Sequence, residues 1–193
     1  MADKLIPTPS QTVGPFFHLG LARAEWGDLT AGNPSGEHIA IEGRVIDGDG
    51  APVPDALIEL WQANAAGRYN HPDDRQDEKP LDPHFRGFGR VATDAEGRFR
   101  VVTVKPGPVP GRGNALQAPH INIALCARGL LKHLYTRIYF ADEAANASDP
   151  LLSSIEDEGA RRSLLALREG GSPAVYRFDI VLQGDNETAF LDI

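Results

Sequence analysis

The stretch HIAIEGRVI at residues 38–46, followed by DGDG at 47–50, decides the fold that we expect for this chain. Ile39, Ile41 and Val45 alternate with small or polar residues. A period of two is typical of a β-strand with one buried face. Aspartate and glycine favour turns, so we expect the strand to end at the DGDG segment.

Similar short apolar runs recur along the rest of the chain. Glycine and proline account for 20 and 15 of the 193 residues, which indicates many turns between short elements. About seven short strands separated by turns predict an all-β fold, a β-sandwich, and a chain of this length suits one domain. The further strands are expected at residues 56–62, 87–93, 98–104, 120–126, 134–140 and 176–183.

The segments outside these strands are less regular. Residues 1–37 are rich in proline and glycine, and they are expected to form an extended N-terminal arm, with residues 38–193 as the β-sandwich domain. One short helix is expected near residues 156–168, where leucines occupy a limited face and acidic residues come first. Residues 64–85 are polar and too numerous for a hairpin, so they are expected to form a long surface loop.

Charge and hydropathy exclude several kinds of partner. The formal net charge is −8 with no basic block, so neither a nucleic acid nor a membrane surface is an expected partner. No apolar run approaches the roughly 18 residues of a membrane span. Asp3, Pro7 and Pro9 stand where a signal peptide would be apolar, so a cytoplasmic location is expected. The single cysteine, Cys126, is expected to be a small buried hydrophobe.

His120 is the histidine whose surroundings have the geometry of a ligand site. Side chains alternate along a strand, so His120 and Asn122 share one face while Ile121 and Ile123 take the other. Two histidines spaced in this way can bind one metal ion, but an amide is a weak ligand for a ferric ion. From the residues alone, a strand histidine beside a hydrogen-bonded amide is the simpler interpretation.

Several uncommon segments occur together and in order along the chain. They are TPSQTVGPF (8–16), LIELWQANAAGRYNH (57–71), DPHFRGFGR (82–90), TVKPGP (103–108), APHINIAL (118–125) and YRFDI (176–180). With these segments the chain resembles the intradiol ring-cleaving dioxygenases. The resemblance covers essentially the whole chain and implies the β-sandwich of that family.

The resemblance implies that catalytic members of the family hold a non-haem ferric ion with two tyrosines and two histidines. Tyr69 and His120 match two of these ligand positions. Val109 stands where the second tyrosine would be, and Asn122 replaces the second histidine. Two of four ligands are too few to enclose a trivalent hard cation. We therefore expect no metal site and no catalytic residue in this chain.

The resemblance also implies the role of a chain with this pattern. It would pair with a homologous beta subunit that carries Fe(III), within a higher-order alpha–beta oligomer, and help to close the active-site cleft. The arm at residues 1–37 would contact that partner subunit. The enzyme would convert protocatechuate (3,4-dihydroxybenzoate) and O2 to 3-carboxy-cis,cis-muconate. Matching positions imply substrate contacts for Thr12, Gly14, Pro15 and Arg128. Glycine permits close backbone approach, and arginine can bind a carboxylate.

Two alternatives remain open at this point. The chain could be a self-sufficient dioxygenase that holds iron with Tyr69, His120 and a residue such as His71 or His84. It could also be a β-sandwich binding or scaffolding module, because a shared fold does not establish catalysis. Iron content would test the first alternative, and replacement of Arg128 would test the second.

Overall fold

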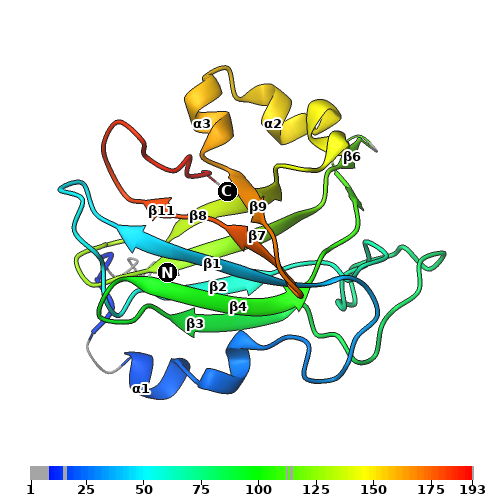
Figure 1. The fold of residues 1–193 in the computed structure, drawn as a ribbon, viewed down its shortest axis with the longest axis horizontal. Coiled ribbons are helices and arrows are strands. Elements are labelled where there is room, and N and C mark those ends of the chain that lie inside the picture. Colours follow the sequence, from blue (N-terminus) through cyan, green and yellow to red (C-terminus); the bar gives the residue numbers. More distant parts are fainter. Residues whose placement is uncertain (1–8, 15–16, 112, 114, 193) are drawn as a thin grey trace, which may run out of the picture.

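The computed structural model describes residues 9–14, 17–111, 113 and 115–192. Within them, nine strands form one sheet in the order β4, β1, β10 with β11, β9, β8, β7, β2, β3, and the sheet folds over into two layers (Figure 1). The nine strands are β1 His38–Ile46, β2 Leu57–Trp61, β3 Phe88–Ala92, β4 Arg98–Val104, β7 His120–Cys126, β8 Leu134–Phe140, β9 Leu165–Glu169, β10 Ala174–Arg177 and β11 Ile180–Val181.

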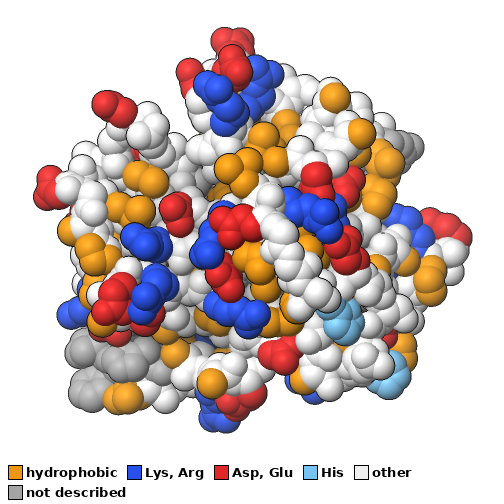
Figure 2. Space-filling model, in the orientation of Figure 1, with side chains coloured by type: hydrophobic (Ala, Val, Ile, Leu, Met, Phe, Trp, Pro, Cys, Tyr) orange, Lys and Arg blue, Asp and Glu red, His pale blue; other side chains and the backbone are white. Residues whose placement is uncertain are grey.

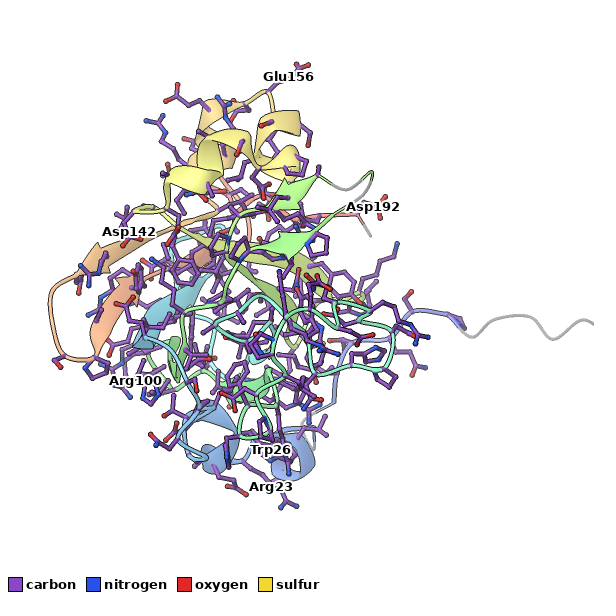
Figure 3. All side chains as sticks on the ribbon, turned by 90° about the vertical axis from the view of Figure 1, so that its right-hand side faces the viewer. Arg23, Trp26, Arg100, Asp142, Glu156 and Asp192 are labelled. Carbon is purple, nitrogen blue, oxygen red and sulfur yellow. The ribbon has the colours of Figure 1, made fainter. Side chains whose placement is uncertain are left out.

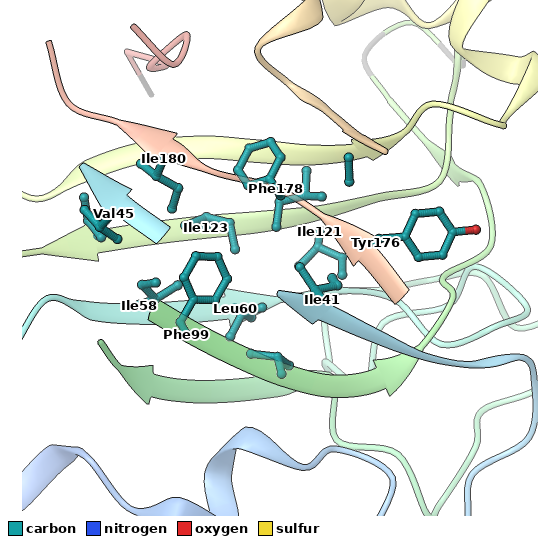
Figure 4. Close-up of a cluster of buried hydrophobic side chains, with 14 of the residues drawn as sticks. Ile41, Val45, Ile58, Leu60, Phe99, Ile121, Ile123, Tyr176, Phe178 and Ile180 are labelled. Carbon is teal, nitrogen blue, oxygen red and sulfur yellow. The ribbon is translucent and has the colours of Figure 1, made fainter. Parts of the chain in front are cut away.

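The hydrophobic core lies between the two layers (Figure 4). Ile41 of β1, Ile58 of β2 and Ile121 of β7 are fully buried there, as the alternation in the sequence predicts. The all-β sandwich is therefore confirmed, and β1, β2, β3, β4, β7 and β8 lie within the expected ranges. The short strands β5 (Val109–Pro110) and β6 (Leu116–Gln117) form a separate two-stranded sheet.

The helix expected near residues 156–168 is wrong in its extent. Helix α3 covers only Glu158–Arg162, and the chain then enters β9. Strand β9 pairs with β8 and β10, and Ala166 is fully buried while Leu167 is 62% exposed. The leucine spacing suits either a helix face or a strand, and sheet partners that are distant in the sequence decide the outcome.

More helical turns occur than the one expected. Among the described residues, the other helical segments are all short. They are α1 Phe17–Leu21, the 3₁₀ turns η1 Ala24–Gly27 and η3 Ala144–Ser148, and α2 Pro150–Ser154.

The strand expected at residues 176–183 is interrupted. Its two parts, β10 and β11, pair in parallel with β1 in one continuous register, from Ile39 with Ala174 to Ile46 with Val181. Between them the Asp179 carboxylate accepts a hydrogen bond from the Arg44 backbone N–H at 2.8 Å. A side chain thus replaces the ladder bond at this point.

Part of the N-terminal segment packs on the sandwich. The Leu29 backbone N–H donates to the Val102 carbonyl at 2.8 Å, and Leu29 packs against the core. The guanidinium of Arg23 lies 5.4 Å from the Trp26 ring centre, and Figure 3 shows these two side chains together below the sheet. Residues 23–29 are therefore anchored to this chain, and the expected division at residue 37 stays a prediction.

The face of the molecule seen in Figure 1 carries interspersed basic and acidic side chains (Figure 2). Glu42 of β1 pairs with Arg100 and Arg177 on the neighbouring strands, each at 3.0 Å. Such exposed pairs contribute little stability individually, typically about 0–1 kcal/mol. No helix in the described part of the chain is long and apolar enough to cross a bilayer. Cys126 is half-buried rather than fully buried, and burial raises the pKa of its thiol.

Candidate functional site

The four positions at which the family resemblance places iron ligands form one cluster, which we call the vestigial ligand cluster (Tyr69, Val109, His120 and Asn122). His120 begins β7, and Asn122 follows on the same face. Register in the sheet places Tyr139 of β8 opposite His120 and Arg137 opposite Asn122. Directly opposed residues on one face of a sheet bring their side chains into contact. Strand β7 therefore carries two members of the cluster, and β8 carries the side chains that face them.

Tyr69 enters the cluster from the long loop that follows β2. Its ring stacks on Trp61, with ring centres 5.6 Å apart and planes 18° apart. The Asn122 Nδ2 donates a hydrogen bond to the Tyr69 hydroxyl at 3.4 Å and to the Trp61 carbonyl at 3.2 Å. Burial raises the pKa of Tyr69, so the side chain is a neutral phenol at neutral pH.

Val109 lies in β5 and is 4% exposed. With Trp61 and Tyr69 it lines a pocket of about 500 Å³. Gly67, at a φ of +80°, lets the loop pack against this corner, because a Cβ there would collide with the Pro108 carbonyl. The corner that would present a second tyrosine is thus retained, but Val109 has no donor atom.

Arg137 is the member of this site that the sequence analysis missed. Its Nε donates to the Asn122 Oδ1 at 2.9 Å, and its Nη1 donates to the Gln117 Oε1 at 2.6 Å and to the Tyr139 hydroxyl at 3.3 Å. The signal in the sequence is a lone arginine within the aromatic run LYTRIYF (134–140). Only the pairing of β7 with β8 shows that this arginine faces Asn122.

His120 is neutral in this environment. The side chain is buried, and its Nδ1 lies 2.8 Å from the Ala118 carbonyl oxygen. A carbonyl only accepts, so Nδ1 carries the proton and donates to it. Burial, together with the nearby positive charge of Arg137, lowers the pKa of His120 to about 4.

The residues present do not fit a ferric ion. Val109 offers no ligand atom, and the two polar ends of the Asn122 amide are engaged with Arg137 and with Tyr69 and Trp61. A guanidinium, which repels a cation, lies against the cluster. No group of three His, Cys, Asp or Glu side chains in the described ranges could hold a metal ion. His71, a ligand in the self-sufficient alternative, lines the same pocket as Tyr69 and Val109 and meets Trp61 edge-on with ring centres 6.4 Å apart.

A second site forms where the N-terminal segment meets the turn after β7. The Thr12 Oγ1 donates to the Ala127 carbonyl at 3.3 Å and accepts from the Gly129 N–H at 2.8 Å. Thr12 is therefore bound to both neighbours of Arg128, although 116 positions separate them in the sequence. The structure thus brings together two of the predicted substrate contacts.

The surroundings of these residues are open. The Arg128 side chain is 55% exposed and pairs with Asp55 at 3.2 Å. Gly14 is exposed, and no described atom comes within 4 Å of the position that a Cβ on it would occupy. Pro15, the fourth predicted contact, lies outside the described residues. We call Thr12, Gly14 and Arg128 the arm–turn cluster.

The two clusters lie at opposite ends of β7. His120 begins this strand, and Arg128 follows its last residue, Cys126. Six residue steps of about 3.3 Å place the two ends about 20 Å apart. Arg128 is therefore too far away to act on anything bound between Tyr69 and His120. Whatever the arm–turn cluster contacts lies outside this chain's own vestigial centre.

The two-layer β-sandwich agrees with the fold expected for a dioxygenase. The family model described as Dioxygenase matches residues 13–184, and the chain belongs to this family. Protocatechuate 3,4-dioxygenase alpha chain from Pseudomonas putida is 45% identical over an alignment 206 positions long, gaps included. The alignment covers 100% of this chain and 100% of that protein.

Two further comparisons place the chain among related proteins. The beta chain of protocatechuate 3,4-dioxygenase from Burkholderia cepacia is 44% identical over 191 residues, which cover 93% of this chain and 77% of that protein. The dioxygenase domain of a carbohydrate-binding fusion protein from Streptomyces sp. SirexAA-E superposes with a TM-score of 0.64 at 27% identity, covering 95% of this chain and 100% of that one. Because identity hardly separates the alpha from the beta relative, the residues of the site must decide between them.

Proposed function

We propose that this chain is the subunit without iron in a heteromeric protocatechuate 3,4-dioxygenase. A homologous beta subunit holds the Fe(III), and the assembly inserts both atoms of O2 between the two hydroxyl-bearing carbons of protocatechuate to give 3-carboxy-cis,cis-muconate. The full-length similarity to an alpha chain supports this role. The replacement of two ligand positions by Val109 and Asn122 supports it independently.

In this proposal the arm–turn cluster faces the partner's active site. The two hydrogen bonds of Thr12 hold the N-terminal segment against the turn that carries Arg128, so the arm and the guanidinium are placed together. Arg128 binds the substrate carboxylate with its fork of N–H groups. Gly14 lets backbone approach the ring, and Pro15 is expected beside it.

The observation that carries the proposal is the separation of the two clusters along β7. An exposed arginine that binds a carboxylate can serve a reaction centre only if that centre is near. The vestigial ligand cluster is about 20 Å away and lacks two ligand side chains. This separation supports a second subunit as the source of the metal next to Arg128.

Co-expression with a homologous beta subunit tests the proposal. We expect the complex to contain one iron per alpha–beta pair, to absorb visible light through tyrosinate bound to iron and to consume O2 with protocatechuate, whereas this chain purified alone should be colourless. Stoichiometric iron in the isolated chain would contradict the proposal and support the self-sufficient alternative.

Replacement of Arg128 tests the substrate contact within that complex. Arg128→Ala should raise the apparent KM for protocatechuate by about 10- to 100-fold, the value of a charged hydrogen bond. Arg162→Ala on helix α3 removes another exposed arginine that is paired with a carboxylate, Glu158, and serves as the matched control. Unchanged kinetics for Arg128→Ala would favour a scaffolding role for this chain.

A further inference from the structure

Arg137 occupies the middle of a network of polar groups beside the vestigial ligand cluster. It donates three hydrogen bonds, to Gln117, Asn122 and Tyr139. The Tyr139 hydroxyl in turn donates to the buried Asp149 at 3.1 Å. A half-buried cation is thus connected through one phenol to a fully buried carboxylate.

Asp149 is fixed independently of Arg137. Its carboxylate accepts hydrogen bonds from the backbone N–H groups of Ala118, Leu151 and Leu152 at 2.8 to 3.0 Å. Asp149 is also the N-cap of helix α2, so its position is set by the fold and not by the cluster. The network therefore has its own anion, and Arg137 is the cation that balances it.

Register places this cation where it opposes any metal ion. Residue 122 is directly opposite residue 137 in the β7–β8 ladder, so a ligand side chain at residue 122 would point toward the guanidinium. The Asn122 Oδ1, the atom best suited to face a cation, already accepts from the Arg137 Nε at 2.9 Å. A metal at this position would meet a positive charge in a largely desolvated site.

We propose that Arg137 replaces the metal ion in this centre and is the residue that excludes iron, so that restoring the two missing ligand side chains alone does not restore a metal site. The guanidinium supplies the positive charge and the directed hydrogen bonds that tie β7, β8 and the Gln117 end of β6 together. In this proposal the chain excludes iron for two reasons: Arg137 takes the place of the metal cation, and two ligand side chains are missing. The proposal concerns this chain alone, so its failure would leave the proposed function of the heteromer unaffected.

The test compares three variants of the full-length chain, expressed without a partner in iron-supplemented medium. The first, V109Y/N122H, restores the ligand side chains and keeps Arg137. The second adds Arg137→Gln, which removes the charge but keeps an N–H donor for Gln117. The third adds Arg137→Lys instead, which keeps the charge and serves as the matched control. Iron stoichiometry, competition with a colourless chelator and the visible tyrosinate absorption are the readouts.

The variant with Gln at residue 137 should bind iron about 10- to 100-fold more tightly than the other two, the range found for residues next to metal ligands, and it should be coloured. Equal iron affinity in all three variants would overturn the proposal. Circular dichroism reports folding in each case. If the Gln variant fails to fold even with iron present while the Lys variant folds, the proposal is also overturned, because the centre would then require its own cation rather than a metal.

Discussion

The burial of a neutral His120 makes the stability of this chain depend on pH in a defined window. The ordinary pKa of histidine is 6.5, and in the folded chain the pKa of His120 is about 4. Between these values the unfolded chain holds a proton on this residue that the folded chain does not. The free energy of unfolding therefore decreases as the pH falls through this window, and it is unaffected by His120 above about pH 7.

The size of the effect follows from the same two values. A difference of about 2.5 in pKa, at about 1.4 kcal/mol for each pH unit, corresponds to about 3.5 kcal/mol in total. About 3 kcal/mol of this is lost between pH 6.5 and pH 4, because His120 is only half-titrated at each end of the window. His120 is 3% exposed, so solvent screening reduces this figure little. A loss of this size is a substantial part of the stability of a typical domain.

Urea unfolding of the full chain at a series of pH values measures this loss. Other groups titrate in the same range, so the informative quantity is the difference between the wild type and His120→Asn. Asparagine keeps an N–H that can donate to the Ala118 carbonyl and does not titrate. We expect the free energy of unfolding of the variant to fall by about 3 kcal/mol less than that of the wild type between pH 6.5 and pH 4.

His84→Asn, at an exposed histidine, is the control and should behave like the wild type. If His120→Asn and the wild type lost the same stability over this window, the neutral buried histidine would be refuted. An imidazole that protonates without cost would also mean that Arg137 lies further from the ring than the structure shows.

Three further predictions follow from packing and hydrogen bonding elsewhere in the chain. Ile121→Ala, in the fully buried core, should lower the free energy of unfolding by about 2–5 kcal/mol in urea titrations, whereas Leu131→Ala, at a 63% exposed site, should change it by less than about 0.5 kcal/mol. Asp149→Ala leaves several buried donors without an acceptor and should cost about 3 kcal/mol in the same assay; a cost below about 1 kcal/mol would show that the carboxylate does not organise α2 and Ala118. Asp55→Asn should lower the apparent KM of the assembled enzyme for protocatechuate by about two- to fivefold, because an exposed ion pair of about 1 kcal/mol no longer competes for Arg128. Asparagine suits the φ of +59° at this position. An increase in KM would refute this competition.

The strands that carry the core could be predicted from the sequence because their signal is local. Ile39, Ile41 and Val45 alternate with smaller or polar residues in the way typical of a strand, and the same holds for β7. The segment at residues 156–168 failed for the opposite reason. Whether Leu165 and Leu167 belong to a helix or a strand depends on β8 and β10, and no local pattern encodes those partners.

The candidate site divides in the same way. The match of Tyr69, Val109, His120 and Asn122 to ligand positions could be inferred from motifs that resemble those of a known family. Arg137 could not, because its role depends on the register between β7 and β8. The contact between Thr12 and the turn at Arg128 joins segments more than 100 residues apart, and only the resemblance suggested that they act together.

In the proposed function, the arrangement along β7 lets a chain without a metal centre contribute to catalysis in a partner subunit. The vestigial ligand cluster lies at the start of β7 and the arm–turn cluster at the turn that follows it, with no residue in common. Changes at His120 or Asn122 are therefore expected to leave Arg128 in place. The vestigial ligand cluster borders the buried core. Arg137, Tyr139 and Asp149 are joined there by hydrogen bonds. In the proposed function, the turn after β7 is then available for contacts with the partner subunit.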